Sequence, residues 1–172
     1  MKFFIRKLVE SDCEAYRVVR LNAFQESSSS FSESYEDECQ KPFEFFHALV
    51  GESPEHFTLG SFSSSNELVG FATFKRDQRR KARHKGFIHT MYVAPKHRGQ
   101  KIAEDILRNI TEIALTMAGL EQIHLWVLNP ETSLARKLYL KTGFKSQGPM
   151  VRNDLIIDGI YIDAEYMTLA LT

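Results

Sequence analysis

Segment 97–103, which reads HRGQKIA, has the residue types and the position of a phosphate-binding loop. It lies between an expected strand, 87–93, and an expected helix, 101–117, so unpaired backbone N–H groups and the positive end of the helix dipole point to one place. Arg98 supplies a planar fork of donors, and Gly99 lets the backbone approach a ligand closely. The same residues also fit an ordinary solvated helix start, and the segment alone leaves both interpretations open.

The composition of the chain predicts one globular domain over residues 1–172. Of the 172 residues, 43% are hydrophobic and 26% are charged, which is enough apolar material for a core. Lys plus Arg and Asp plus Glu number 22 each, so no overall field favours nucleic acid or an anionic membrane.

The sequence carries no targeting or metal-binding signal. Its start, MKFFIRKLVESD, has too short an apolar run for a signal peptide, and no stretch approaches the length of a membrane span. A cytoplasmic location without a membrane partner is therefore expected. Cys13 and Cys39 are interpreted as reduced thiols, and the six His show no ligand spacing, so no metal is expected.

Alternating apolar runs and amphipathic stretches predict strands and helices along most of the chain. Strands are expected over 3–8, 56–62, 67–75, 87–93, 123–127, 151–157 and 161–171. Helices are expected over 13–24, over 35–49 with a break near Pro42, over 101–117, and from Asn129 through Lys141. Because the long helix crosses over between two strands, those strands pair in parallel, and the rest of the sheet is largely antiparallel with helices on its faces.

Two polar segments are open to more than one interpretation. Segment 25–34, with four serines at 27–30, fits a solvated linker and also fits the lining of a substrate entrance. Segment 76–86, RDQRRKARHKG, fits a solvated hairpin loop and also a phosphate or nucleic-acid contact. No aromatic residue lies among these charges for base stacking, so nucleic acid is not the expected partner.

A second motif, A-x-x-x-Y-x-x-x-G-F, is formed by Ala135, Tyr139, Gly143 and Phe144. With the loop and the segments IRKLVESDCEAYRVVRLNAF, ELVGFATF, HKGFIHTMYVAPKHRG and DGIYIDAEYMTLAL, the chain resembles the GNAT superfamily of acetyl-CoA-dependent N-acetyltransferases. The resemblance implies an α+β fold whose central, mostly antiparallel sheet has about seven strands, with a parallel βαβ unit at the cofactor site and helices on both faces. It also implies acetyl-CoA as cosubstrate and an amine as acceptor.

The resemblance assigns cofactor contacts to individual positions. Backbone groups at the end of the strand would pair with the pantetheine arm, the loop would hold the pyrophosphate, and polar groups before the next helix would lie beside the cofactor. The splaying of 87–93 from 123–128 would open the slot between the two substrates. These cofactor-binding positions are Met91, Tyr92, Val93, Arg98, Gly99, Gln100, Lys101, Ile102, Ala103, Asn129 and Thr132.

Acetyl transfer to an amine needs two proton movements. An amine with a pKa of roughly 10 must lose a proton before it attacks, and a thiolate with a pKa of about 8.5 gains from a proton donor. Tyr139 matches the tyrosine that relatives keep near the cofactor sulfur, and the N–H near Val93 would stabilise the developing oxyanion. His89 lies an even number of residues from Val93, so it is expected on the same face as a base, although it equally fits a structural histidine.

The acceptor and two departures from the family pattern complete the expectations. Acidic residues concentrate in 26–44, which favours a cationic amine and also fits a solvated helix face. Lys101 stands where the family loop has its central glycine. A lysine could keep its backbone N–H in place there if the residue were already part of the helix. Thr132 replaces the usual asparagine and would cap the next helix, while Asn129 takes over the amide's function. A non-catalytic GNAT fold that binds CoA or a protein therefore stays as the alternative, and homodimer formation is left open.

Overall fold

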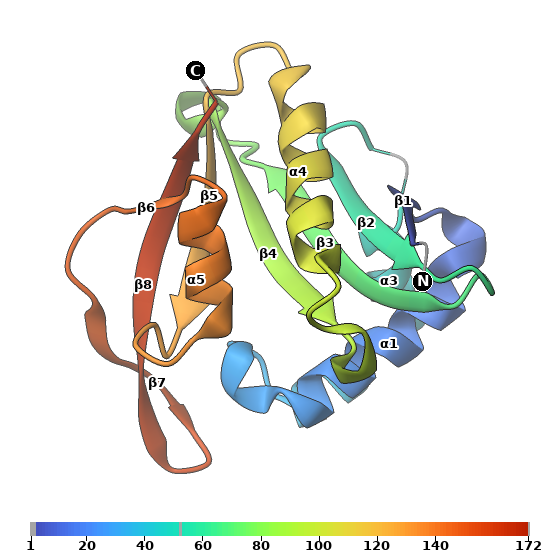
Figure 1. Ribbon diagram of the computed structural model, residues 1–172, viewed down its shortest axis with the longest axis horizontal. Coiled ribbons are helices and arrows are strands. Elements are labelled where there is room, and N and C mark those ends of the chain that lie inside the picture. Colours follow the sequence, from blue (N-terminus) through green and yellow to red (C-terminus); the bar gives the residue numbers. More distant parts are fainter. Residues whose placement is uncertain (1–2, 52, 172) are drawn as a thin grey trace.

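An eight-stranded sheet forms the centre of the computed structural model (Figure 1), which describes residues 3–51 and 53–171. The ends of the expected domain 1–172 lie outside the described residues. The strand order is β1-β2-β3-β4-β5-β8-β6, with β7 paired to β8. The strands are β1 Phe4–Lys7, β2 His56–Phe62, β3 Leu68–Arg76, β4 Lys85–Val93, β5 Gln122–Leu128, β6 Lys145–Ser146, β7 Val151–Ile157 and β8 Ile160–Ala170. Only β4 and β5 pair in parallel among the described strands, which confirms the expected fold class.

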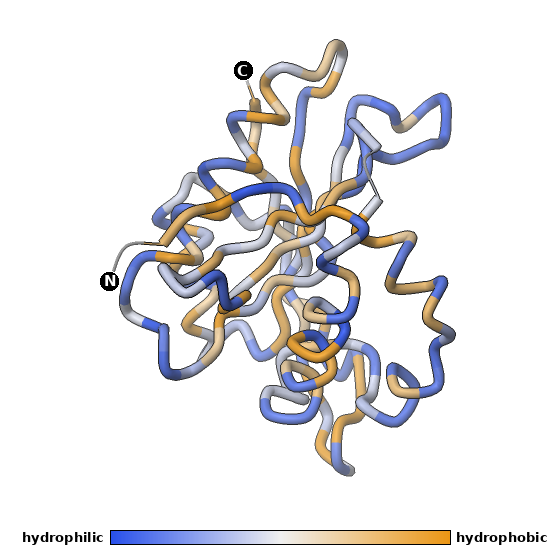
Figure 2. The backbone as a smooth tube through the Cα atoms, turned by 90° about the vertical axis from the view of Figure 1, so that its right-hand side faces the viewer, coloured by the Kyte–Doolittle hydropathy of each residue, from blue (hydrophilic) through white to orange (hydrophobic). Residues whose placement is uncertain are grey.

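Helices cover both faces of this sheet (Figure 1). α4, Ile102–Leu115, and α5, Leu134–Lys141, pack on one face, where Ile106 and Ile110 of α4 are fully buried. α1, Cys13–Glu26, and the shorter α2, Tyr35–Cys39, and α3, Phe43–Leu49, lie on the other face. Hydrophobic and hydrophilic residues alternate along the helices, and the outer loops are largely hydrophilic (Figure 2). No helix within 3–51 or 53–171 is both long and apolar enough to cross a bilayer.

Several local predictions are confirmed at turns and helix ends. Pro42 separates α2 from α3, because its fixed φ suits the start of a helix better than its interior. Gly143 adopts a φ of +95° after α5, as expected of a left-handed helix end. Asp158 and Gly159, with φ of +51° and +77°, form the tight turn between β7 and β8.

The parallel pair opens towards one end of the sheet. β4 and β5 are in register only from Lys85 to Phe87, opposite Gln122 to His124. Beyond these positions the two strands diverge, as Figure 1 shows. The expected splaying is therefore confirmed, and it begins after His124.

The pairing of β3 with β4 contains an irregularity near the same place. Thr73 pairs with Thr90, but the next residue, Phe74, pairs with Ile88. His89 is therefore the extra residue of a β-bulge, which bends the strand and re-aims the side chains around it.

The basic connection between β3 and β4 is partly internal. Arg76 is buried and donates to Glu55 at 3.0 Å, to the Arg83 carbonyl at 2.6 Å and to the Ala118 carbonyl at 2.9 Å. The interpretation of this connection as a solvated loop is wrong for Arg76. Its guanidinium is hydrogen-bonded to the segment before β2, through Glu55, and to the segment after α4, through Ala118. Lys81 at the loop's tip is exposed, as expected.

Candidate functional site

The loop between β4 and α4 leaves backbone donors free at the start of the helix. After Val93 the chain makes a 3-10 turn at Pro95–His97 and enters α4 at Ile102, and no side chain caps this end of the helix. Gly99 has a φ of +76°, and the direction in which a Cβ would point is open. Free N–H groups at a 14-residue helix's positive end form an environment for an anion.

Lys101 adopts a left-handed conformation rather than a helical one. Its φ and ψ are 63° and 8°, and it is the residue immediately before α4. The expectation that a lysine at this position would suit the loop by being helical is wrong, since the turn needs a positive φ here. A side chain with a Cβ pays about 1–2 kcal/mol for this conformation, which explains why glycine suits the position.

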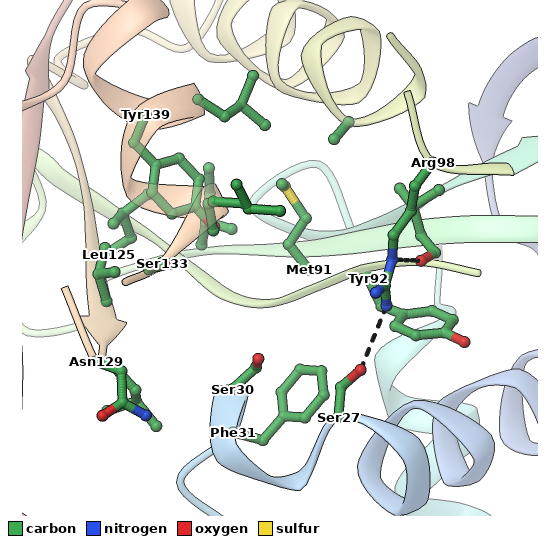
Figure 3. Close-up of a pocket in the computed structure, with 18 of the residues that line it drawn as sticks. Ser27, Ser30, Phe31, Met91, Tyr92, Arg98, Leu125, Asn129, Ser133 and Tyr139 are labelled. Carbon is green, nitrogen blue, oxygen red and sulfur yellow. Dashed lines mark hydrogen bonds between the residues drawn. The ribbon is translucent and has the colours of Figure 1, made fainter. Parts of the chain in front are cut away.

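Arg98 is engaged with the protein itself. Its Nε donates to the Val93 carbonyl at 2.9 Å, and its Nη2 donates to Ser27 Oγ at 3.3 Å (Figure 3). Nη2 also donates to Glu26 at 3.4 Å. The same Glu26 carboxylate accepts from the Tyr92 hydroxyl at 2.7 Å. The guanidinium therefore connects the end of β4 to the end of α1.

A first cavity of about 660 Å³ opens beside this loop, between the diverging ends of β4 and β5 and next to α5. Gln100, which is exposed, does not line it. The predicted site residues that do line it are His89, Met91, Tyr92, Val93, Arg98, Gly99, Lys101, Ile102, Ala103, Asn129, Thr132 and Tyr139.

Tyr139 extends from α5 into the first cavity, towards Met91 (Figure 3). Its ring packs against Phe144, with 5.6 Å between the centroids, and burial raises the pKa of its hydroxyl to about 12. Within residues 3–51 and 53–171 the hydroxyl has no hydrogen-bond partner. The phenol thus keeps its proton at neutral pH and can donate it to a group in the cavity.

The approach to α5 differs from the sequence-based expectation. The helix begins at Leu134, and Ser133 caps it by accepting from the Arg136 backbone N–H at 3.3 Å. Thr132 instead donates to the Asn129 carbonyl at 3.4 Å, so the prediction that Thr132 caps this helix is wrong. The reason is the turn at Asn129, whose φ of 47° moves the helix start further along the chain.

The segment rich in serine also contributes to the first cavity. Ser27, Ser30 and Phe31 line it opposite Met91, as Figure 3 shows. Of the two interpretations of 25–34, the structure supports the one in which this segment lines an entrance. Phe31 had no signal in the sequence, because its burial depends on stacking against Phe24 of α1, with centroids 4.4 Å apart.

A second cavity, of about 580 Å³, lies on the side of the sheet that α1 covers. It shares wall residues with the first cavity, among them Phe31, Ile88, His89 and Leu125. The two cavities therefore meet where β4 and β5 separate. Two ligands could approach each other at this opening from opposite sides.

His89 lies where the two cavities meet, but its side chain does not have the orientation that the sequence predicts. Counting in steps of two from Val93 puts His89 on the α4 face, whereas the bulge turns it towards Phe87, with ring centroids 6.0 Å apart. The prediction that His89 shares the face of Val93 is wrong, because the extra residue breaks the alternation. Although His89 is classed among the exposed residues, loss of hydration lowers the pKa of its ring, and Lys75 lowers this pKa further. His89 is thus neutral at pH 7 and able to accept a proton.

Comparison with known protein families identifies the chain as an acetyltransferase. The family model described as Acetyltransferase (GNAT) family matches residues 20–144, and the chain belongs to this family. No curated protein sequence matches the chain.

Solved structures with the same fold include several acetyltransferases. The GNAT acetyltransferase of Streptococcus pneumoniae superposes with a TM-score of 0.81 at 21% identity, covering 98% of this chain and 99% of that one. A phosphinothricin acetyltransferase from Sinorhizobium meliloti, solved with acetyl-CoA, gives 0.81 at 16% identity over 99% and 89% of the two chains. The N-acetyltransferase of Staphylococcus aureus Mu50 gives 0.79 at 18% identity over 100% of both. At these identities the likeness establishes the fold.

Proposed function

We propose that this protein transfers an acetyl group from acetyl-CoA to a primary amine while both substrates are bound. The observation that carries the proposal is the meeting of two cavities at the splayed ends of β4 and β5, with His89 between them. The first cavity would hold acetyl-CoA and the second cavity the amine.

The open edge of β4 suits an extended pantetheine arm. Ala94 donates its backbone N–H to the Val69 carbonyl at 2.9 Å, so Ala94 is hydrogen-bonded to β3. Because this bonding alternates along an antiparallel ladder, the backbone groups of Val93 and Met91 point away from β3 towards the opening. The contact from Arg98 to the Val93 carbonyl agrees with this direction. Met91 would then bind the arm through main-chain hydrogen bonds, Val93 would present its N–H to the thioester end of the arm, and Tyr92 would contribute only its side chain.

The start of α4 suits the pyrophosphate. Backbone N–H groups from Ile102 onwards, together with the open conformation of Gly99, would receive the phosphate oxygens. Lys101 would add a charge from its exposed side chain. Asn129, in the wall of the first cavity opposite the loop, would bind polar groups of the arm.

Three groups of the chain have positions that suit acetyl transfer. When bound, acetyl-CoA supplies a thioester whose carbonyl carbon can accept the amine. His89, neutral at pH 7, would take a proton from the amine directly or through a water. The Val93 N–H would donate to the carbonyl oxygen, and the Tyr139 phenol would give its proton to the departing sulfur.

The proposal is tested by measuring acetyl-CoA binding and thiol release separately. Acetyl-CoA should raise the melting temperature, and at least one primary amine should show saturable release of free thiol together with an acetylated product. Stabilisation without thiol release from any amine would favour a non-catalytic CoA-binding protein instead. Absence of both effects would overturn the proposal.

A further inference from the structure

The innermost charged group of the second cavity is Arg20 of α1, which is only 5% exposed. Its Nε donates to the buried carboxylate of Glu38. Its Nη1 donates to the Tyr16 hydroxyl and to Thr90 Oγ1, both at 3.2 Å. No group within the described ranges 3–51 and 53–171 accepts from Nη2. A fixed, buried guanidinium therefore has donors left for a ligand in the second cavity.

Lys75 adds a positive charge at the wall of the same cavity. It lies on β3 between His56 of β2 and Phe87 of β4, its cross-strand partners, so the three side chains share the face that α1 covers. Lys75 is exposed and lines the second cavity, and it forms no ion pair with any residue that the structure describes. Lys75 thus contributes a charge that the protein itself does not neutralise.

The pKa values of the two histidines beside Lys75 are both lowered by its positive charge. The pKa of His56 is lowered first by burial, then by Lys75 and by His89. The pKa of His89 is lowered first by burial and then by Lys75, while Glu33 raises it and Arg20 lowers it. Positive charge is therefore disfavoured where the walls of the second cavity carry these rings.

Acidic groups contribute less to this cavity than the sequence suggests. Of the acidic residues in 26–44, only Glu33 lines it. Glu38 is buried against Arg20, and Glu26 is bound by Tyr92 and Arg98 outside it. Asp154 of β7 is the other acidic lining residue, and both it and Glu33 are exposed. The acidic residues of 26–44 therefore do not form a surface that selects a cationic acceptor.

On the basis of the proposed function, we propose that the acceptor is an amine that also carries a carboxylate. Lys75 and the free Nη2 of Arg20 bind the carboxylate. The amine then extends towards His89 at the opening between β4 and β5. Arg20 and Lys75 are in this way residues that determine specificity.

The experiment compares acceptors that differ only in the carboxylate. Straight-chain ω-amino acids and α-amino acids are each paired with the corresponding carboxamide, and thiol release from acetyl-CoA is measured for both members. The carboxylates should have a kcat/KM higher by about tenfold or more, because they add charge-assisted hydrogen bonds that the amides lack. Binding is followed in parallel by ligand-detected NMR with CoA present, which does not depend on turnover.

Variants separate the site from a general effect of charge. Lys75→Gln should reduce the preference for carboxylates about tenfold. Lys145→Gln removes a lysine that is also exposed and on a strand but lies outside both cavities, and it should leave the preference unchanged. Arg20→Lys keeps the charge beside Glu38 but loses the guanidinium fork, so it should weaken carboxylate binding, provided that circular dichroism shows a folded protein.

The outcomes distinguish this inference from the proposed function. Thiol release with the carboxamides equal to that with the carboxylates would overturn the inference and leave the proposed acetyltransferase activity intact. Carboxylate binding by NMR that Lys75→Gln does not change would overturn it as well. Carboxylate binding that Lys75→Gln abolishes, without thiol release from any amine, would support the anion site and overturn the proposed reaction.

Discussion

Replacing Tyr139 by Phe removes one hydroxyl from the first cavity and little else. The ring would keep its packing against Phe144, 5.6 Å away between centroids. The hydroxyl has no hydrogen-bond partner among the residues that the structure describes, so its loss breaks no contact. We therefore expect the free energy of unfolding to change by less than about 1 kcal/mol.

The expected effect on catalysis follows from the proton that Tyr139 would donate. Proton transfer by a positioned group accelerates reactions by about 10²–10⁴-fold. A thiol with a pKa of about 8.5 departs readily even without help, so the lower end applies, and kcat should fall about 100-fold, or about 2.7 kcal/mol. Affinity for acetyl-CoA should stay within about threefold, because one unpaired hydroxyl contributes little to binding.

The assay follows thiol release at saturating acetyl-CoA and measures acetyl-CoA binding by calorimetry. Tyr161→Phe serves as the control, because this tyrosine is exposed on β8 and lines neither cavity. As the pKa of Tyr139 is raised to about 12, the wild-type rate should not decline through deprotonation of this group below pH 10. An unchanged kcat in Tyr139→Phe would refute the role of proton donor.

Four further perturbations have expected outcomes. Lys101→Gly relieves the left-handed conformation at 63° and should raise the melting temperature by about 2–4 °C in a thermal scan; a lower value would mean that the lysine side chain stabilises the loop. His89→Ala should lower kcat/KM about 100-fold at neutral pH. In the wild type, the fall of kcat/KM towards acidic pH should have its midpoint below pH 6.5, because the pKa of His89 is lowered. A midpoint above pH 6.5 would exclude His89 as the base. Arg98→Lys keeps the charge but not the paired contacts to Val93 and Ser27, so kcat should fall about tenfold, whereas an unchanged kcat would show that charge alone suffices. Burial lowers the pKa of His124 to about 4, so between pH 7 and pH 4 the unfolded chain binds a proton that the native state does not. After discounting for solvent screening, chemical denaturation should show a free energy of unfolding about 2 kcal/mol lower at pH 4 than at pH 7. A His124→Phe variant whose free energy of unfolding depends on pH to the same extent would contradict this.

The position of the loop between β4 and α4 could be predicted because its signal is local. Arg98 to Ala103 follow a strand and open an amphipathic helix, and these neighbouring patterns fix where the free N–H groups point. The motif around Tyr139 is similarly local, since its spacing places Ala135 and Tyr139 on one face of a short helix. Both segments line the first cavity.

Positions that depend on distant partners could not be predicted from the sequence. The bulge at His89 arises from the register between β3 and β4, which nothing within β4 itself encodes. Arg98 binds Glu26 and Ser27, more than 70 residues earlier in the chain, and the spacing around Arg98 gives no sign of them. Counting the acidic residues in 26–44 could not show which of them line the second cavity for the same reason, because the burial of Glu38 against Arg20 is a tertiary contact.

The most direct test of the account is the kinetic pattern when both substrates are varied. The central claim is that acetyl-CoA in the first cavity and an amine in the second cavity are bound together, so that acetyl passes directly between them. Initial rates of thiol release, measured against acetyl-CoA at several fixed amine concentrations, should give intersecting double-reciprocal lines. Parallel lines, together with acetylated protein detected by mass spectrometry in the absence of amine, would contradict the claim.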